Sequence, residues 1–238
     1  MLPLPKGYPM RHALSLLLST LALTVLDASA QTPPAIEGPV YVATYVELVS
    51  AGIGEGGALL KQYRDAARKD AGNQRMELVQ EIGRPTRFAL LAIWADQKAF
   101  EAHGKAAPTA QFRDKLKAVN AAPYDERVHS GMSVGTKDAP RAGALAVVTH
   151  VDVPGSFKDA VVPLLQQLSE ASRKELGNLR FEVQQQGNRP NHFTVVEQWA
   201  EPKAHDAHVA AAHTRQFREK LGPMVGALYD ERLYRTID

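Results

Sequence analysis

Hydrophobic and polar positions alternate along the chain in a pattern that predicts short strands separated by helices. Four segments of strand length are rich in β-branched and aromatic residues, at 40–49, 75–82, 88–94 and 124–132. Apolar residues at helical spacing predict a helix around 59–67, between the first two strands. One or two short helices are expected over 97–119. The predicted order is β-α-β-β-α-β, which is the ferredoxin-like unit.

The same pattern occurs twice in the chain. Shifting the chain by 105 residues aligns 70–127 with 175–232, and 27 of these 58 positions are identical. The strand at 144–153 and the helix around 164–171 repeat the start of the first copy. We therefore predict one repeat over 38–132 and another over 144–238, with a Gly-, Pro- and charge-rich linker at 133–143.

Each such unit places its helices on one face of an antiparallel sheet, and the other face must be buried against something. Two copies in one chain can cover each other. We therefore expect an α+β fold in which the repeats form an intramolecular version of a dimeric α+β barrel. Pairing across chains in a larger homo-oligomer is the alternative.

The first 30 residues have the layout of a secretory signal peptide. Basic residues precede the apolar run 13–26, and Ala28-Ser29-Ala30 provides small residues for cleavage. The run has 14 residues, fewer than the roughly 20 that a membrane-spanning helix needs. Residues 1–30 are thus expected to direct export to the periplasm or beyond, without stable membrane insertion after cleavage. Met10 is an alternative start, and an uncleaved anchor is the alternative role for this segment.

Composition excludes several functions. The chain has no Cys, so disulfides, thiolate nucleophiles and Cys-based metal centres are ruled out. With 28 basic and 26 acidic residues and no basic run, nucleic acid is not an expected partner. The sequence contains no phosphate loop, dinucleotide fingerprint or nucleophile-elbow motif. We therefore expect no cofactor.

One motif resembles a known family. The pattern E-x-W-x-x-x-x-A-x-x-x-H, followed by a Phe, is similar to that of antibiotic biosynthesis monooxygenase (ABM) domains. The second copy has it as Glu197, Trp199, Ala204, His208 and Phe217; the first has Trp94, Ala99, His103 and Phe112, with Ala92 in place of the Glu. The resemblance implies the dimeric α+β barrel and a cofactor-free, quinol monooxygenase-like activity. A haem-degrading branch of the superfamily is a poorer match, because Arg113 and Arg218 stand near the place of its axial His.

His103 and His208 are the candidate catalytic bases. Each shares a helical stripe with small Ala residues and no bulky neighbour, so each could face a cavity. A neutral imidazole there could accept a phenolic proton. A packed histidine hydrogen-bonded to the backbone is the alternative.

Other residues are candidates for substrate binding. Trp94 and Trp199, with Phe112 and Phe217, could wall a flat aromatic ring or could simply be core. Tyr45 and His150 occupy equivalent positions on the first strands, and Glu197 is matched by Ala92. These differences suggest that the second copy holds the working pocket, although drift after duplication would also produce them.

A metal site is not expected. His205, His208 and His213 are close in sequence, but no Cys or obvious carboxylate completes a ligand set. We expect them to form a partly solvated face.

The leading hypothesis is an exported, cofactor-independent monooxygenase acting on a small quinol-like or polyphenolic aromatic molecule and O2. A non-catalytic binding module for an aromatic or lipophilic ligand is the second hypothesis, and a haem-binding protein is the third.

Overall fold

The computed structural model describes residues 35–135 and 143–237. The expected signal peptide, 1–30, lies outside these residues, as does most of the expected linker at 133–143. Within the described part of the chain, no helix is long and apolar enough to cross a membrane.

The first repeat has the predicted order of elements. They are β1 (Val40–Glu47), η1 (Ser50–Gly52), α1 (Ile53–Ala67), β2 (Asn73–Glu81), β3 (Arg87–Trp94), α2 (Gln97–Lys105), α3 (Ala107–Leu116) and β4 (Asp125–Ser133).

The second repeat follows the same plan. Its elements are β5 (Leu145–Asp152), η2 (Gly155–Phe157), α4 (Lys158–Ser172), β6 (Asn178–Gln186), β7 (His192–Trp199), α5 (Pro202–Ala210), α6 (Ala212–Leu221), η3 (Gly222–Met224) and β8 (Asp230–Ile237).

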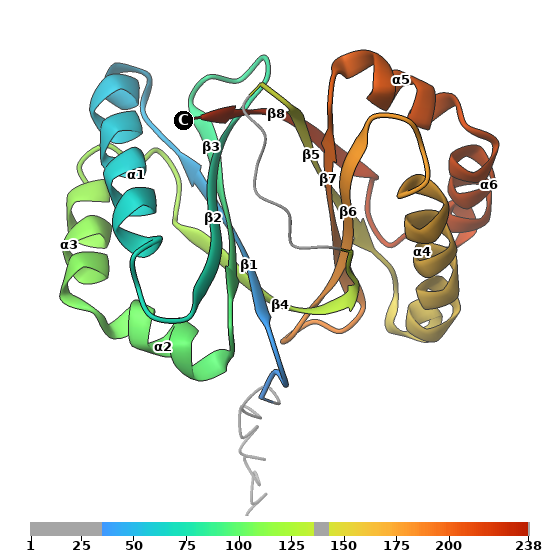
Figure 1. The fold of residues 1–238 in the computed structure, drawn as a ribbon, viewed down its shortest axis with the longest axis horizontal. Helices are drawn as coiled ribbons and strands as arrows, with labels where there is room; N and C mark the ends of the chain where they lie inside the picture. Colours follow the sequence, from blue (N-terminus) through green and yellow to red (C-terminus); the bar gives the residue numbers. More distant parts are fainter. Residues whose placement is uncertain (1–34, 136–142, 238) are drawn as a thin grey trace, which may run out of the picture. The chain divides into compact units, whose positions relative to one another are not determined.

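The eight strands close into one antiparallel barrel in the order β1-β3-β2-β8-β5-β7-β6-β4. The repeats join edge to edge, because β2 pairs with β8 and β4 pairs with β6. Helices α1–α3 lie outside the strands of the first repeat and α4–α6 outside those of the second (Figure 1). The predicted intramolecular α+β barrel is confirmed.

Alternation along each strand divides the core into an outer part and an inner part. On β3, Phe88, Leu90, Ala92 and Trp94 face the helices, in a cluster with the apolar side of α1 and α3. The second repeat builds an equivalent cluster beneath its own helices. A third cluster, with Ala43, Val79, Val148 and Tyr234 among its members, fills the barrel interior with side chains from both repeats.

A close contact explains why a glycine and an alanine recur at equivalent positions of the two repeats. Gly72 and Gly177 have φ near +82° and end the turns directly before β2 and β6. A Cβ added to Gly72 would lie 2.5 Å from the Cβ of Ala99, and one added to Gly177 would lie 2.7 Å from that of Ala204. Glycine at the turn and alanine on the helix are therefore both needed to seat α2 and α5 against the sheets.

Two buried ion pairs cross between the repeats inside the barrel. Arg75 Nη2 lies 2.6 Å from Glu182 Oε2, and Arg180 reaches Glu77 with both terminal nitrogens at 2.6 and 2.7 Å. These positions are related by the 105-residue shift, so the pairs are reciprocal. Burial alone raises the pKa of Glu77, but Arg180 more than offsets this and holds the pKa below its usual value. The carboxylate therefore stays ionised.

Breaking one of these pairs should destabilise the fold strongly. Glu77→Gln removes the buried negative charge that Arg180 contacts with both terminal nitrogens, and we expect a loss of about 3–5 kcal/mol in the free energy of unfolding. Denaturant titration measures it. Asp114→Asn is the control, because it removes the carboxylate that pairs with the exposed Lys117. It should lower the free energy of unfolding by less than about 1 kcal/mol. Similar small losses for both variants would show that the crossing pairs do not stabilise the barrel.

The interior also predicts an acid sensitivity. His129 is fully buried, with Nε2 2.9 Å from Thr194 Oγ1, and burial lowers its pKa to about 4. Because the folded-state pKa lies below the unfolded value, the stabilisation is complete above about pH 6.5 and is lost as the pH falls toward 4. We expect the wild type to lose up to about 3 kcal/mol through this group over that range.

His129→Gln should flatten this part of the stability curve, measured by denaturant titration at pH 7, 5.5 and 4. Tyr234 is the counterpart of His129 in the second repeat, and Tyr234→Phe should change stability by the same amount at each pH. An unchanged acid slope in His129→Gln would refute the assignment.

Candidate active site

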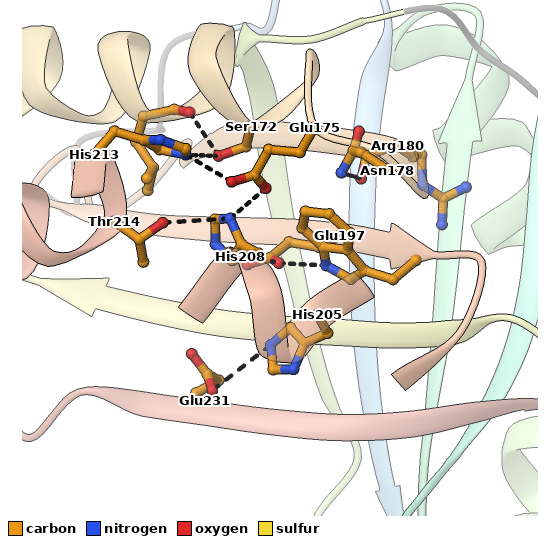
Figure 2. Close-up of polar contacts among 12 residues, drawn as sticks. Ser172, Glu175, Asn178, Arg180, Glu197, His205, His208, His213, Thr214 and Glu231 are labelled. Carbon is orange, nitrogen blue, oxygen red and sulfur yellow. Dashed lines mark hydrogen bonds and ion pairs between the residues drawn. The ribbon is translucent and has the colours of Figure 1, made fainter. Parts of the chain in front are cut away.

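His208 lies in a buried polar cluster of the second repeat. Helix α5 places it over the end of β7, with its ring centroid 4.9 Å from that of Trp199. Its Nδ1 is 2.8 Å from Glu175 Oε2, and its Nε2 is 4.0 Å from Glu197 Oε2. The Trp199 indole N–H donates to Glu197 at 2.8 Å (Figure 2). Three residues that the motif singled out, Glu197, Trp199 and His208, are thus brought together.

Burial sets the charge of this cluster. Desolvation raises the pKa of Glu197 to about 8, although the hydrogen bond from Trp199 opposes the shift. It lowers the pKa of His208 to about 3, with further contributions from His205 and His213. Glu197 is therefore held protonated and His208 neutral at neutral pH. The contact of His208 with Glu175 is accordingly a hydrogen bond rather than an ion pair.

In the first repeat, His103 has protein partners on both ring nitrogens. Its Nε2 is 2.7 Å from the Tyr63 hydroxyl and its Nδ1 is 2.7 Å from Asp70 Oδ2. The ring stacks on Trp94 with centroids 4.4 Å apart. Phe112 stacks on Tyr63 at 3.8 Å. This arrangement matches the packed-histidine alternative, with side chains rather than backbone as partners.

Bulky side chains from outside the helical stripe cover both histidines. The helical stripe itself carries only small residues, but Trp94 and Trp199 reach each imidazole from the end of the neighbouring strand. Both Trp side chains are almost completely buried, and Phe112 and Phe217 are buried in the same two clusters. A helix pattern alone does not report what the adjacent strand contributes.

The second repeat has a surface pocket beside this cluster, between α6 and the loop that precedes β8. Its volume is about 360 Å³. Leu221, Val225 and Leu228 give it apolar walls, and Arg218, Tyr229 and Glu231 add polar groups. His208, Trp199 and Phe217 are not among the lining residues.

An acid–base group stands at the pocket wall. Arg218 Nη2 lies 2.9 Å from Glu231 Oε2, and its guanidinium sits 5.3 Å from the centre of the Tyr229 ring. Behind them, the buried His205 places Nε2 3.9 Å from Glu231 Oε1 (Figure 2). That nitrogen has no hydrogen-bond partner among the described residues. Burial lowers the pKa of His205, which favours the neutral imidazole.

The first repeat has only part of this arrangement. Arg113 pairs with Glu126 at 3.1 Å and lies over Tyr124, as Arg218 does over Tyr229. Phe100, however, occupies the position of His205. The difference between the repeats therefore lies in the buried base rather than in the Arg–Glu pair.

Tyr45 and His150 lie on the other face of the sheet, inside the barrel. Their rings meet edge to face with centroids 5.4 Å apart. His150 Nδ1 is 3.3 Å from Thr194 Oγ1, and Arg127 and Arg232 both stand over the Tyr45 ring. The structure does not bring these two residues to His208, because their side chains lie on the face of the sheet opposite to that of Glu197 and Trp199.

The three neighbouring histidines are not a partly solvated face. His205 and His208 are buried, and only His213 is appreciably exposed, at 30 %. Sequence reasoning also missed Glu175, which comes from the loop after α4 and contacts both His208 and His213.

Two sequence signals could have found the missed residues. Acidic residues occupy positions 70 and 175, each 33 residues before the motif His. The Tyr-Asp-Glu-Arg tetrapeptide occurs in both repeats, at 124–127 and 229–232. Identical polar residues in diverged copies indicate a shared contact. Here, the Glu of the tetrapeptide pairs with Arg113 in the first repeat and with Arg218 in the second.

These features define an eight-stranded α+β barrel with an outer pocket in the second repeat. The sequence matches the family Antibiotic biosynthesis monooxygenase over residues 39–115 and 144–220, more than half of the chain. The protein belongs to this family, with one family domain in each repeat.

Solved structures share the complete two-repeat fold. A candidate monooxygenase from Fusobacterium nucleatum superposes with a TM-score of 0.74 at 13% identity, covering 84% of this chain and 93% of that one. A candidate monooxygenase from Lactobacillus acidophilus gives 0.69 at 13% identity, over 84% and 94% of the two chains. An anthrone oxidase-like protein gives 0.65 at 11% identity, over 87% and 95%. No curated protein matched the sequence.

Proposed function

We propose that the protein is a cofactor-independent monooxygenase that oxidises a quinol-like or polyphenolic aromatic substrate with O2 in the pocket of the second repeat. The observation that carries the proposal is the apolar pocket walled by the Arg218–Glu231 pair, with the unpartnered Nε2 of His205 behind it. Family membership and the candidate monooxygenases of the same fold support it.

The chemistry needs little from the protein. A hydroquinone that has lost its proton is electron-rich enough to pass an electron to O2, which gives a semiquinone and superoxide. Their recombination forms a C–O bond, and loss of water from the hydroperoxide leaves one oxygen atom in the product. The substrate supplies all the electrons, so no external reductant enters. A dry pocket and a base are the main requirements.

The pocket residues fit these requirements. Glu231 can accept a hydrogen bond from the substrate hydroxyl, and His205 behind it can take up the proton. Arg218 provides positive charge for the phenolate that forms. Leu221 and Leu228 offer apolar surface against which the ring can pack. We assign the base role to His205 rather than His208, because His205 neighbours a pocket-lining carboxylate and His208 is hydrogen-bonded to Glu175.

A binding module for an aromatic or lipophilic ligand is the second candidate function. The observation that favours it is the apolar rim of the pocket, where the Leu228 side chain is 93 % exposed. Such a module needs the same walls but no base, so the two functions separate when His205 is replaced.

Oxygen uptake with a panel of small hydroquinones tests the catalytic function. We expect His205→Phe, which introduces the residue of the first repeat, to lower kcat/KM by about 100-fold or more through loss of the base. Substrate binding, followed by tryptophan fluorescence, should change little. Chelator-treated buffer is required, because free transition metals catalyse hydroquinone autoxidation.

Glu126→Gln is the matched control for Glu231→Gln. It removes the equivalent carboxylate of the first repeat and should leave uptake unchanged, whereas Glu231→Gln should reduce it. Ligand binding without uptake above the uncatalysed rate would replace the enzyme with the binding module. Equal losses in both Glu variants would place the reaction elsewhere.

We further propose that the protein acts outside the cytoplasm. The basic start, the apolar run 13–26 and the small residues at 28–30 support export. Expression of the whole chain in a secreting bacterium should yield a soluble periplasmic form beginning at Gln31, as measured by intact mass. Recovery of the full-length chain from the cytoplasm would contradict the assignment.

A further inference from the structure

Glu175, His208 and His213 converge from three separate elements of the second repeat. Glu175 follows α4, His208 lies on α5 and His213 lies on α6. One carboxylate oxygen is 2.8 Å from His208 Nδ1 and the other is 3.0 Å from His213 Nε2. Figure 2 shows both imidazoles directed at the same carboxylate. Two imidazoles and a carboxylate are the donors that divalent transition metals prefer.

The spacing of the donor atoms suits a shared ion. One oxygen and the two nitrogens all lie within 4.8 Å of one another. Ligands held at about 2.1 Å around one ion lie about 3.0 to 3.4 Å apart in octahedral or tetrahedral geometry. The donor atoms that lie furthest apart would have to approach one another by at most about 1.4 to 1.8 Å to share one centre. Glu175 and His213 are partly exposed, which leaves a side open for water and for entry of the ion.

The first repeat isolates what is special about this cluster. Asp70 and His103 reproduce the carboxylate–imidazole contact at 2.7 Å. There, the second imidazole is missing, because Pro108 occupies the position of His213. A second difference concerns the other ring nitrogen. Tyr63 hydrogen-bonds the other nitrogen of His103, whereas its counterpart Leu168 offers the second repeat no hydroxyl.

Two hydroxyl groups lie beside the donor nitrogens themselves, and a carboxyl group lies near the far side of the His208 ring. Thr214 Oγ1 lies 3.3 Å from His208 Nδ1, and Ser172 Oγ lies 3.5 Å from His213 Nε2. The Glu197 carboxyl group stands 4.0 Å from the far nitrogen of His208. Metal-binding histidines commonly have an acceptor on that side, which orients the ring. Among the described residues, His208 and His213 are the close side-chain partners of Glu175, so a cation would be the natural complement to this carboxylate.

We propose that Glu175, His208 and His213 form a binding site for a divalent first-row transition metal ion, such as Zn²⁺. The ion would clamp the loop after α4 to α5 and α6, and α6 carries two of the residues that line the pocket. The inference goes beyond the proposed function, since oxidation of the substrate in the pocket requires no metal.

Titration of the chelator-stripped mature protein with Co²⁺ tests the site directly. We expect one equivalent to bind per chain, with visible ligand-field bands that Zn²⁺ abolishes and Mg²⁺ does not. Glu175→Gln and His213→Gln should each weaken binding by at least about 100-fold, the upper end of the effect of losing an outer-shell partner. The melting temperature should rise with Zn²⁺ in the wild type but not in Glu175→Gln or His213→Gln.

Asp70→Asn, at the position of Glu175 in the first repeat, is the matched control and should bind Co²⁺ like the wild type. Circular dichroism at neutral pH verifies that each variant is folded, and the partial exposure of Glu175 and His213 favours this. No Co²⁺ bands in the wild type, or equal binding in His213→Gln, would leave only a hydrogen-bonded cluster and overturn the proposal. Because these readouts involve no turnover, their failure is separate from failure of the oxygenase assignment.

Discussion

Neither repeat can complete its own sheet, and this constraint organises the rest of the molecule. Each half has four strands in ferredoxin-like order, with an apolar inner face and two unpaired edges. Pairing β2 with β8 and β4 with β6 satisfies both edges, and it closes the inner faces around a common core. The crossing pairs Arg75–Glu182 and Arg180–Glu77 add charge complementarity that only the correct register of the two halves satisfies.

Closure of the barrel places the contacts between the repeats on the inner faces of the strands and leaves the candidate site residues on the outer faces. The inner faces must fit each other, so they carry the reciprocal ion pairs and a core of small and β-branched side chains. The outer faces are covered mostly by the helices of the same repeat, although α4 also contacts β4, where Ser169 Oγ lies 2.6 Å from Ser133 Oγ. There, the second repeat has Glu197, His205 and His213 where the first has Ala92, Phe100 and Pro108. The pocket and the three-donor cluster both lie on the outer side, where substitutions leave the inner-face contacts between the repeats intact.

Periodicity and duplication were sufficient to predict the order of elements and the closed barrel, because these follow from which faces must be buried. The motif also named Glu197, Trp199 and His208, which the structure brings together. What failed depended on contacts between elements. The cover that Trp199 provides for His208, the approach of Glu175 from a distant loop, and the inward direction of His150 are set by packing across strands. The pocket of Arg218 and Glu231 is likewise formed by two segments that periodicity treats separately.

The contact between Tyr45 and His150 has a consequence for how such a barrel can evolve. The two residues stand at equivalent positions, and their rings meet inside the barrel. In an assembly of two identical chains, equivalent positions would hold the same residue, so this contact would be Tyr with Tyr or His with His. Joining the halves in one gene breaks that symmetry and lets each position mutate alone. In the duplicated chain, one substitution at either position is sufficient to give a contact between two different residues, which a symmetric dimer of identical chains could not form.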